Sequence, residues 1–142
     1  MIYALDTNTI IHFSSNNENV LRNFSEAVRH NCRIIVPKIV DYEITRGFRI
    51  LPKPKKESIY RTLMENCIIA EMDASAWEQA IQIYANLYCK RFTVGEMDIL
   101  IAAICLAHDF TLVTNNTNDF KNIDGLKIFD WTHPHQWFFA NG

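Results

Sequence analysis

The chain has 142 residues, a formal net charge of −2 at pH 7, and a hydrophobic share of 49%. This length fits one domain with its own core, and the near-neutral balance argues against a protein held to nucleic acid by net charge alone. The four cysteines have no close pair and no zinc-type spacing, which favours reduced, structural thiols. No secretory leader and no apolar stretch of ~20 residues is apparent, so we expect a soluble, cytoplasmic protein without membrane contact.

The first half of the chain alternates between strand patterns and helix patterns. The continuous apolar run Ile2–Leu5 predicts a buried strand, and Ile34–Val36, closed by Pro37, predicts a second one. Apolar residues at helical spacing follow each of these runs. The helices expected here cover residues 7–13, 19–31, 38–51 and, after two prolines, 55–66.

The second half continues the alternation. Residues 67–72, 111–114 and 126–131 are predicted strands, and residues 76–90 and 96–108 are predicted helices. The inward face of the helix at 76–90 is expected to include Trp77, Ala80, Ile81, Tyr84 and Leu87. Strands interleaved with helices indicate an α/β fold with a parallel sheet covered on both faces.

Acidic side chains recur where the predicted elements meet. Asp6 ends the first strand, Glu43 lies in the helix at 38–51, and Asp98 opens the most apolar helix. Open α/β sheets place ligands at strand ends, and carboxylate oxygens suit hard divalent cations. Each acid also has a structural explanation: Asp6 and Asp98 favour helix starts, and Glu43 can pair with Arg46. Acids gathered at one sheet edge favour a metal-dependent enzyme that acts on phosphate.

The sequence leaves the role of four further segments open. The Asn- and Asp-rich run Thr114–Asp119 is typical of turns and also supplies oxygen ligands or groups that position water. The basic segment 46–61 is either a solvated helical surface or a contact for a nucleic-acid backbone. Near the end, His133 and His135 suit an incidental role better than metal binding. Residues 137–139, Trp-Phe-Phe, either complete the core or stack on bases.

Six short motifs follow one another along residues 1 to about 132. They are Leu5-Asp6-Thr7-Asn8, Glu43-Ile44-Thr45-Arg46-Gly47, Asp98-Ile99-Leu100-Ile101-Ala102-Ala103, Leu112-Val113-Thr114-Asn115-Asn116, Asp119-Phe120 and Asp130-Trp131. In this order and at these intervals they resemble PIN-domain ribonucleases, and among those the VapC toxins of bacterial toxin–antitoxin pairs. The resemblance implies a PIN domain over residues 1–132, followed by a C-terminal tail at 133–142.

The resemblance also implies a fold and an activity. The fold is a three-layer α/β/α arrangement around a parallel sheet of order 3-2-1-4-5. The activity is that of a Mg²⁺- or Mn²⁺-dependent endoribonuclease that cuts a structured RNA, commonly a transfer RNA, and so inhibits translation. Matched motif by motif, the catalytic residues are Asp6, Glu43, Asp98, Asn116 and Asp119.

Within this set, the resemblance assigns Asp6 and Asp98 as metal ligands and Glu43 as a further ligand or as the group that orients the water. Thr7, Asn8 and Thr114 are assigned as hydrogen-bonding partners of the ligands. The family often has Asp where this chain has Asn116, and Asp119 is an available substitute. A neutral residue at this position lowers the negative charge, which should weaken a second metal ion more than the first.

Two partners besides RNA are implied: a VapB-like antitoxin and a second copy of the chain, forming a homodimer. Ile50, Leu51 and Ile59 are candidates to receive the antitoxin, although packing inside the domain explains them equally well. The RNA backbone would meet Arg46, Arg49, Lys53, Lys55 and Lys56.

A competing interpretation is a catalytically weak or inactive PIN-like module that binds RNA or protein, which Asn116 would suit. A receiver-like regulatory module fits poorly, because Asp6 stands alone after the first strand. Metal-dependent cleavage of RNA distinguishes the nuclease from the binding module.

Overall fold

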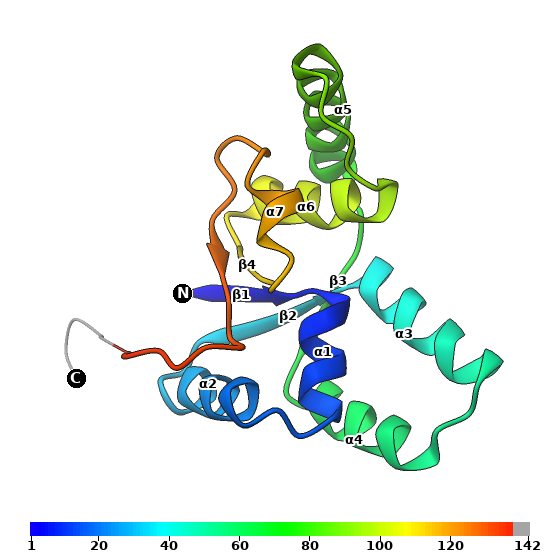
Figure 1. The fold of residues 1–142 in the computed structure, drawn as a ribbon, viewed down its shortest axis with the longest axis vertical. Helices are drawn as coiled ribbons and strands as arrows, with labels where there is room; N and C mark the ends of the chain where they lie inside the picture. Colours follow the sequence, from blue (N-terminus) through cyan, green and yellow to red (C-terminus); the bar gives the residue numbers. More distant parts are fainter. Residues whose placement is uncertain (138–142) are drawn as a thin grey trace.

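A computed structural model of the protein describes residues 1–137 and has a five-stranded parallel sheet at its centre (Figure 1). The strand order is β3-β2-β1-β4-β5, and every neighbouring pair is parallel. The predicted three-layer α/β/α fold and its strand order are therefore confirmed. The strands are β1 (Ile2–Leu5), β2 (Arg33–Pro37), β3 (Ile68–Ala70), β4 (Thr111–Val113) and β5 (Ile128–Phe129).

Helices cover both faces of this sheet. In Figure 1, α1, α2 and α4 lie on one side of the strands, α6 and α7 lie on the other, and α5 packs outside α6. The helices are α1 (Thr7–Ser14), α2 (Glu18–Arg29), α3 (Lys38–Ile50), α4 (Pro54–Met64), α5 (Ala74–Lys90), α6 (Glu96–His108) and α7 (Thr117–Phe120). None of the helices formed by residues 1–137 is both long and apolar enough to cross a membrane.

The central strands are apolar because both of their faces are covered. Val36, Leu112 and Val113 are fully buried, and Leu5 is 1% exposed. The apolar helix α6 packs into the same core, which makes β1, β4 and α6 a fixed platform. Asp6, Thr114 and Asp98 adjoin the ends of these three elements, so their backbone positions are set by the core.

Three predicted strands are longer than the observed ones, the strand at 111–114 by one residue, and helix α7 is not predicted. The strand expected at 67–72 is limited to β3, and the one expected at 126–131 is limited to β5. Both are edge strands, which have one neighbour each. Helix α7 forms where the sequence predicts a turn, because Phe120, only 1% exposed, anchors an otherwise polar segment in the core.

The predicted inward face of α5 is partly wrong. Ala80 and Leu87 are buried as expected, but Trp77, Ile81 and Tyr84 are 51%, 61% and 54% exposed. The reason is the position of α5 outside the α/β/α layers, where it packs mainly against α6 (Figure 1). A helix with a single neighbour buries a narrow strip of its surface, so its apolar face is wider than its contact.

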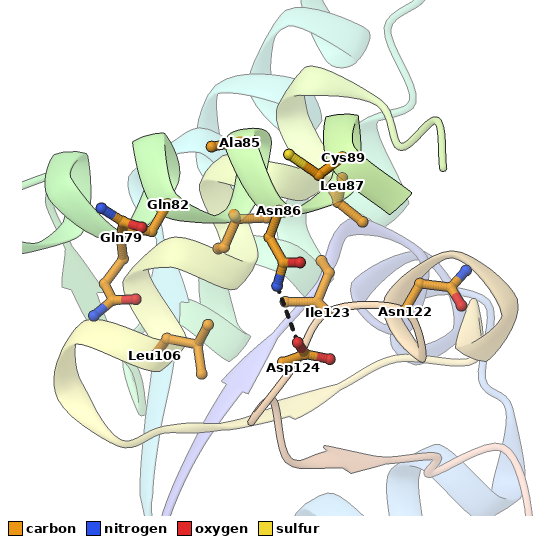
Figure 2. A pocket seen from close by; sticks show the side chains of 11 residues that line it. Gln79, Gln82, Ala85, Asn86, Leu87, Cys89, Leu106, Asn122, Ile123 and Asp124 are labelled. Atoms are coloured by element: carbon orange, nitrogen blue, oxygen red, sulfur yellow. Dashed lines mark hydrogen bonds between the residues drawn. The ribbon is translucent and has the colours of Figure 1, made fainter. Parts of the chain in front are cut away.

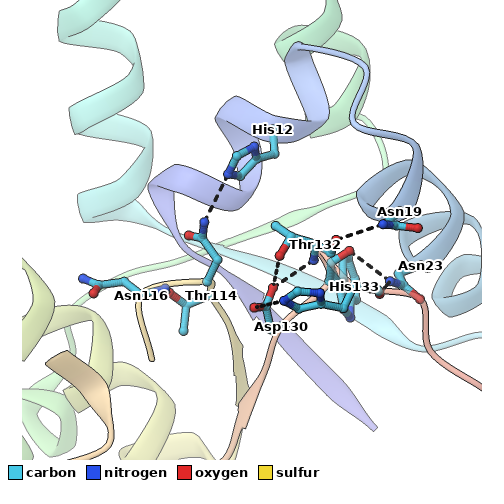
Figure 3. A network of polar contacts seen from close by, with 10 residues as sticks. His12, Asn19, Asn23, Thr114, Asn116, Asp130, Thr132 and His133 are labelled. Atoms are coloured by element: carbon cyan, nitrogen blue, oxygen red, sulfur yellow. Dashed lines mark hydrogen bonds and ion pairs between the residues drawn. The ribbon is translucent and has the colours of Figure 1, made fainter. Parts of the chain in front are cut away.

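Asn23 of α2 joins the C-terminal segment to the domain (Figure 3). It is 1% exposed, and its Nδ2 donates to the carbonyl oxygens of Trp131 (3.0 Å) and His133 (3.1 Å). Its Oδ1 accepts from Nε1 of Trp137 (2.9 Å), whose ring stacks on Phe129. Trp137 therefore packs against the core, whereas residues 138 and 139 lie outside the described residues. The domain boundary at residue 132 stays a prediction.

Candidate active site

Asp6 follows β1 and begins α1. Its Oδ1 accepts from the backbone N of Thr9 at 2.8 Å, and its Oδ2 accepts from the hydroxyl of Thr114. Burial raises the pKa of this carboxyl, and the hydrogen bonds from Thr114 and Thr9 and the charge of His12 oppose that shift. Each carboxylate oxygen can accept more than one bond, so the N-cap role leaves Asp6 able to bind a cation.

Asp98 lies in the first turn of α6 and is half-buried. Burial, together with the negative charges of Asp119, Asp6 and Glu43, raises its pKa to about 6. Four carboxylates from α1, α3, α6 and α7 thus share one region. The structure brings together the acids that the motifs indicate.

The other predicted polar residues hold these acids in place. Thr7 donates its hydroxyl to Oε1 of Glu43 (3.2 Å), and Asn116 donates Nδ2 to Oδ2 of Asp119 (2.9 Å). The backbone N of Asn116 donates to Oγ1 of Thr114 (3.0 Å), which links the loop after β4 to Asp6. By contrast, the side chain of Asn8 is exposed on α1.

The donor set suits a divalent cation that keeps much of its water. Among residues 1–137, no basic side chain forms an ion pair with the four clustered acids, and no three Asp, Glu, His or Cys side chains form a ready metal site. Mg²⁺ commonly binds proteins through one or two carboxylates and retains several waters. A divalent cation would offset the repulsion among these carboxylates. Their oxygens are the kind of ligand that Mg²⁺ and Mn²⁺ prefer.

An apolar cavity of about 240 Å³ opens beside the acids, between α1, α3 and α4. Two of the predicted basic residues, Lys53 and Lys56, line it, as does Leu51 from the predicted antitoxin contacts. Ile50 is 81% exposed nearby, and Ile59 is half-buried on α4. The full lining is Thr7, Ile11, Ser14, Glu43, Ile44, Gly47, Phe48, Leu51, Lys53 and Lys56.

The remaining basic residues do not share this cavity. Arg46 stands over the ring of Tyr42, with its Cζ 4.9 Å from the ring centroid, so the predicted pairing with Glu43 is not what the structure shows. Arg49 lines a different cavity, together with Tyr60. Lys55 is exposed on α4. The basic segment is thus several small surfaces, of which one adjoins the acids.

Another cavity, of about 440 Å³, lies between α5, α6 and the loop after α7 (Figure 2). Amide side chains line it, and Asp124 at its edge accepts hydrogen bonds from Asn86 and Lys90, both at 2.9 Å. Its carboxylate is therefore already neutralised. None of the four clustered acids lines this cavity, which separates it from the candidate active site.

Two residues at this edge of the sheet, Thr9 and His12, are not predicted from the sequence. Thr9 donates its hydroxyl to the carbonyl of Val113 (2.9 Å), and its position three residues after Asp6 is the N-cap spacing that could have revealed it. His12 contacts Asn115 across the end of β4, for which the sequence offers no signal. The tail histidines lie elsewhere: His133 is 3.5 Å from the carboxylate of Asp130.

The chain is similar in sequence to known VapC ribonucleases along nearly its whole length. Ribonuclease VapC2 of Rickettsia felis is 29% identical over 132 residues, which cover 92% of this chain and 98% of that protein. The tRNA(fMet)-specific endonuclease VapC of Salmonella typhimurium is 28% identical over 131 residues, covering 91% of this chain and 97% of the relative.

Solved structures agree with the architecture. A crystal structure of VapBC2 from Rickettsia felis bound to promoter DNA superposes with a TM-score of 0.85 at 27% identity, covering 92% of this chain and 99% of that one. DNA-bound VapBC from Salmonella typhimurium gives 0.82, also at 27% identity, with 92% and 98% covered. The PIN domain model matches residues 3–126, most of the chain. The chain therefore belongs to the PIN domain family, with VapC ribonucleases among its relatives.

Proposed function

We propose that the protein is a Mg²⁺- or Mn²⁺-dependent endoribonuclease that hydrolyses phosphodiester bonds of a structured RNA. The main observation is the raised pKa of Asp98, about 6, among the carboxylates of Asp6, Glu43 and Asp119. A carboxyl with a raised pKa among other acids, at the carboxyl edge of an α/β sheet, marks a candidate catalytic site. The ribonuclease names of relatives that span nearly the whole chain support this reaction class.

In this proposal Asp6, Asp98 and Glu43 would hold the metal ion, which would supply positive charge at the phosphate and activate the attacking water. Thr9 and Thr114 fix both oxygens of Asp6, and Thr7 orients Glu43. Asn116 and Asp119, which are hydrogen-bonded to each other, position outer waters. The protein's own contribution is a rigid arrangement of acceptors around the reacting phosphate.

The proposed substrate is a transfer RNA, whose cleavage would inhibit translation in the cytoplasm. One relative is named a tRNA(fMet)-specific endonuclease, so the initiator transfer RNA is the first candidate. Lys53 and Lys56 lie beside Thr7 and Glu43, where they can meet the RNA backbone. Arg46, Arg49 and Lys55 would meet it only if the RNA extends beyond that cavity.

We further propose that a VapB-like antitoxin occupies the apolar cavity beside Glu43. Structural relatives are VapBC toxin–antitoxin complexes, which supports a partner of this kind. An apolar cavity flanked by two lysines suits an amphipathic segment with acidic residues. Leu51→Asp should weaken capture of a co-expressed antitoxin, and unchanged capture would argue against this location.

A homodimer through α5 is the third part of the proposal. The exposed side chains of Trp77, Ile81, Tyr84 and Tyr88 recur at helical spacing along α5. Exposed apolar surfaces of this kind commonly mark protein interfaces. Light scattering should give the mass of a dimer for the wild type and of a monomer for Ile81→Glu. A monomeric wild type would contradict this part of the proposal.

The decisive experiment uses purified, antitoxin-free protein with total bacterial transfer RNA and with initiator transfer RNA. Each is incubated with Mg²⁺, with Mn²⁺ and with EDTA, alongside Asp98→Asn. Discrete fragments that need metal and are absent with the variant are expected, and sequencing their ends would locate the cut. Intact RNA under every condition, with the protein folded, would favour the inactive binding module instead.

A further inference from the structure

His12 of α1 faces the loop that follows β4. Its Nε2 is 3.2 Å from Nδ2 of Asn115, the residue between Thr114 and Asn116 (Figure 3). The imidazole ring is partly exposed, and its charge acts on the carboxylate of Asp6. His12 therefore stands at the β4 side of the acids, whereas Lys53 and Lys56 line the cavity on the α3–α4 side.

The contact with Asn115 leaves a defined donor on the ring. When the Asn115 amide donates to Nε2, a neutral imidazole carries its proton on Nδ1. When the ring is protonated, the amide oxygen accepts from Nε2, and Nδ1 again bears a proton. Within residues 1–137, Nδ1 of His12 makes no hydrogen bond. In these two states the ring presents an Nδ1–H group beside the acids.

We propose that His12, oriented by Asn115, binds the RNA backbone phosphate that flanks the scissile one. This inference rests on the proposed nuclease function and adds to it a substrate contact on the β4 side. An RNA strand that crosses four carboxylates is repelled by them, and hydrogen-bond donors beside the reacting phosphate offset that repulsion. With lysines on one side and His12 on the other, the strand would be held on both sides of the cleaved bond.

The first test measures binding without cleavage. Asp98→Asn serves as the background, and fluorescence anisotropy follows a short labelled single-stranded RNA in Mg²⁺. His12→Ala and Asn115→Ala should each weaken the affinity by about tenfold, the typical effect of one hydrogen bond to a charged group. The double variant should be no weaker than His12→Ala, because Asn115 acts through the ring. His108→Ala, at the opposite end of α6 from Asp98, should bind like the background.

The second test uses the active protein on total bacterial transfer RNA. His12→Ala should raise KM with a smaller change in kcat, and His12→Gln, which keeps an N–H donor, should restore part of the loss. Unchanged KM in His12→Ala, with Asp98→Asn inactive, would overturn the His12 contact while the nuclease function stands. A wild type that cleaves no RNA but binds the probe through His12 would overturn the nuclease and keep the contact. An Asp98→Asn background that does not bind the probe would overturn the contact.

Discussion

The polar side chains around Asn23 and those around Asp98 differ in how far the chain itself supplies them with hydrogen-bonding and charge partners. Around Asn23, the side-chain donors and the acceptor meet partners in the C-terminal segment, and the side chain is 1% exposed. Around Asp98, half-buried carboxylates face one another, and the pKa of Asp98 is raised to about 6. Asn23 joins the C-terminal segment to the domain, whereas the negative charges around Asp98 still raise its pKa.

The comparison shows how to separate stability from function in a single chain. A matched network lowers the free energy of the folded state, and removing a member leaves partners unpaired. Like charges that face one another without a ligand destabilise the folded state, so replacing Asp98 is expected to stabilise the metal-free protein while it removes the proposed activity. The two sites should therefore respond to substitution in opposite ways.

The largest expected effect is the loss of cleavage in Asp98→Asn. If Asp98 binds the metal ion as proposed, its loss removes several kcal/mol of transition-state stabilisation, so the rate should fall by about a thousandfold or more. Gel-based cleavage of transfer RNA measures this, and circular dichroism checks that the fold is retained. Asp6→Ala should behave alike, and cleavage at the wild-type rate in either variant would remove that residue from the site.

The next effect is the loss of stability in Asn23→Ala. The carbonyls of Trp131 and His133 and the indole of Trp137 lose their partner, which should lower the free energy of unfolding by about 2–4 kcal/mol. Urea denaturation measures it. Asn19→Ala, which removes one bond to Thr132, should lower it by about 1 kcal/mol. A change in kcat of folded Asn23→Ala would contradict the separation of the two sites.

A smaller effect is the pH dependence that Asp98 gives to the metal-free protein. Its pKa rises from 3.8 to about 6 on folding, so the folded protein binds more protons than the unfolded chain between these values. Stability should therefore fall as pH rises through that window, by about 1 kcal/mol after allowing for solvent screening. Asp98→Asn should be more stable than the wild type at pH 7 in EDTA, and the difference should vanish near pH 4.

The smallest effect is expected for Asn116→Asp. The substitution replaces the amide that donates to Asp119 with another negative charge, which should destabilise the metal-free protein by about 0.5–1 kcal/mol. It should also tighten divalent-cation binding, measured by calorimetry. Asn118→Asp, the same charge change at an exposed position of α7, is the matched control. Equal metal affinity in both variants would show that position 116 does not face the ion.

The sequence predicts the layered fold well because the central strands are continuous apolar runs. Ile2–Leu5 is observed at its predicted bounds, and Asp98 lies in the predicted helix at 96–108. The prediction fails where burial depends on distant contacts: α7 forms because Phe120 is anchored, and Trp77 is exposed because α5 has a single main neighbour. Tertiary packing decides both cases, and the local pattern of apolar residues holds no information about it.

The same limit applies to the candidate site. Motifs indicate Asp6, Glu43 and Asp98, since each lies next to a strand end or in the first two turns of a helix. They do not indicate His12, because its contact with Asn115 joins segments 103 residues apart. Nor do they show that Lys53 and Lys56 adjoin the acids while Arg49 does not. Such groupings arise from how α1, α3 and α4 pack.

The hydroxyl of Thr114 has one proton, and that proton goes to Asp6 while the oxygen accepts from the backbone of Asn116. These two hydrogen bonds therefore point in one direction, from the backbone N–H of Asn116 through Thr114 to the carboxylate of Asp6. A change of charge at Asp6 is transmitted to the segment that holds Asp119. If a cation binds at Asp6 as proposed, we expect the rigidity of residues 114–119 to change with it, and slower amide exchange in that segment would report its binding.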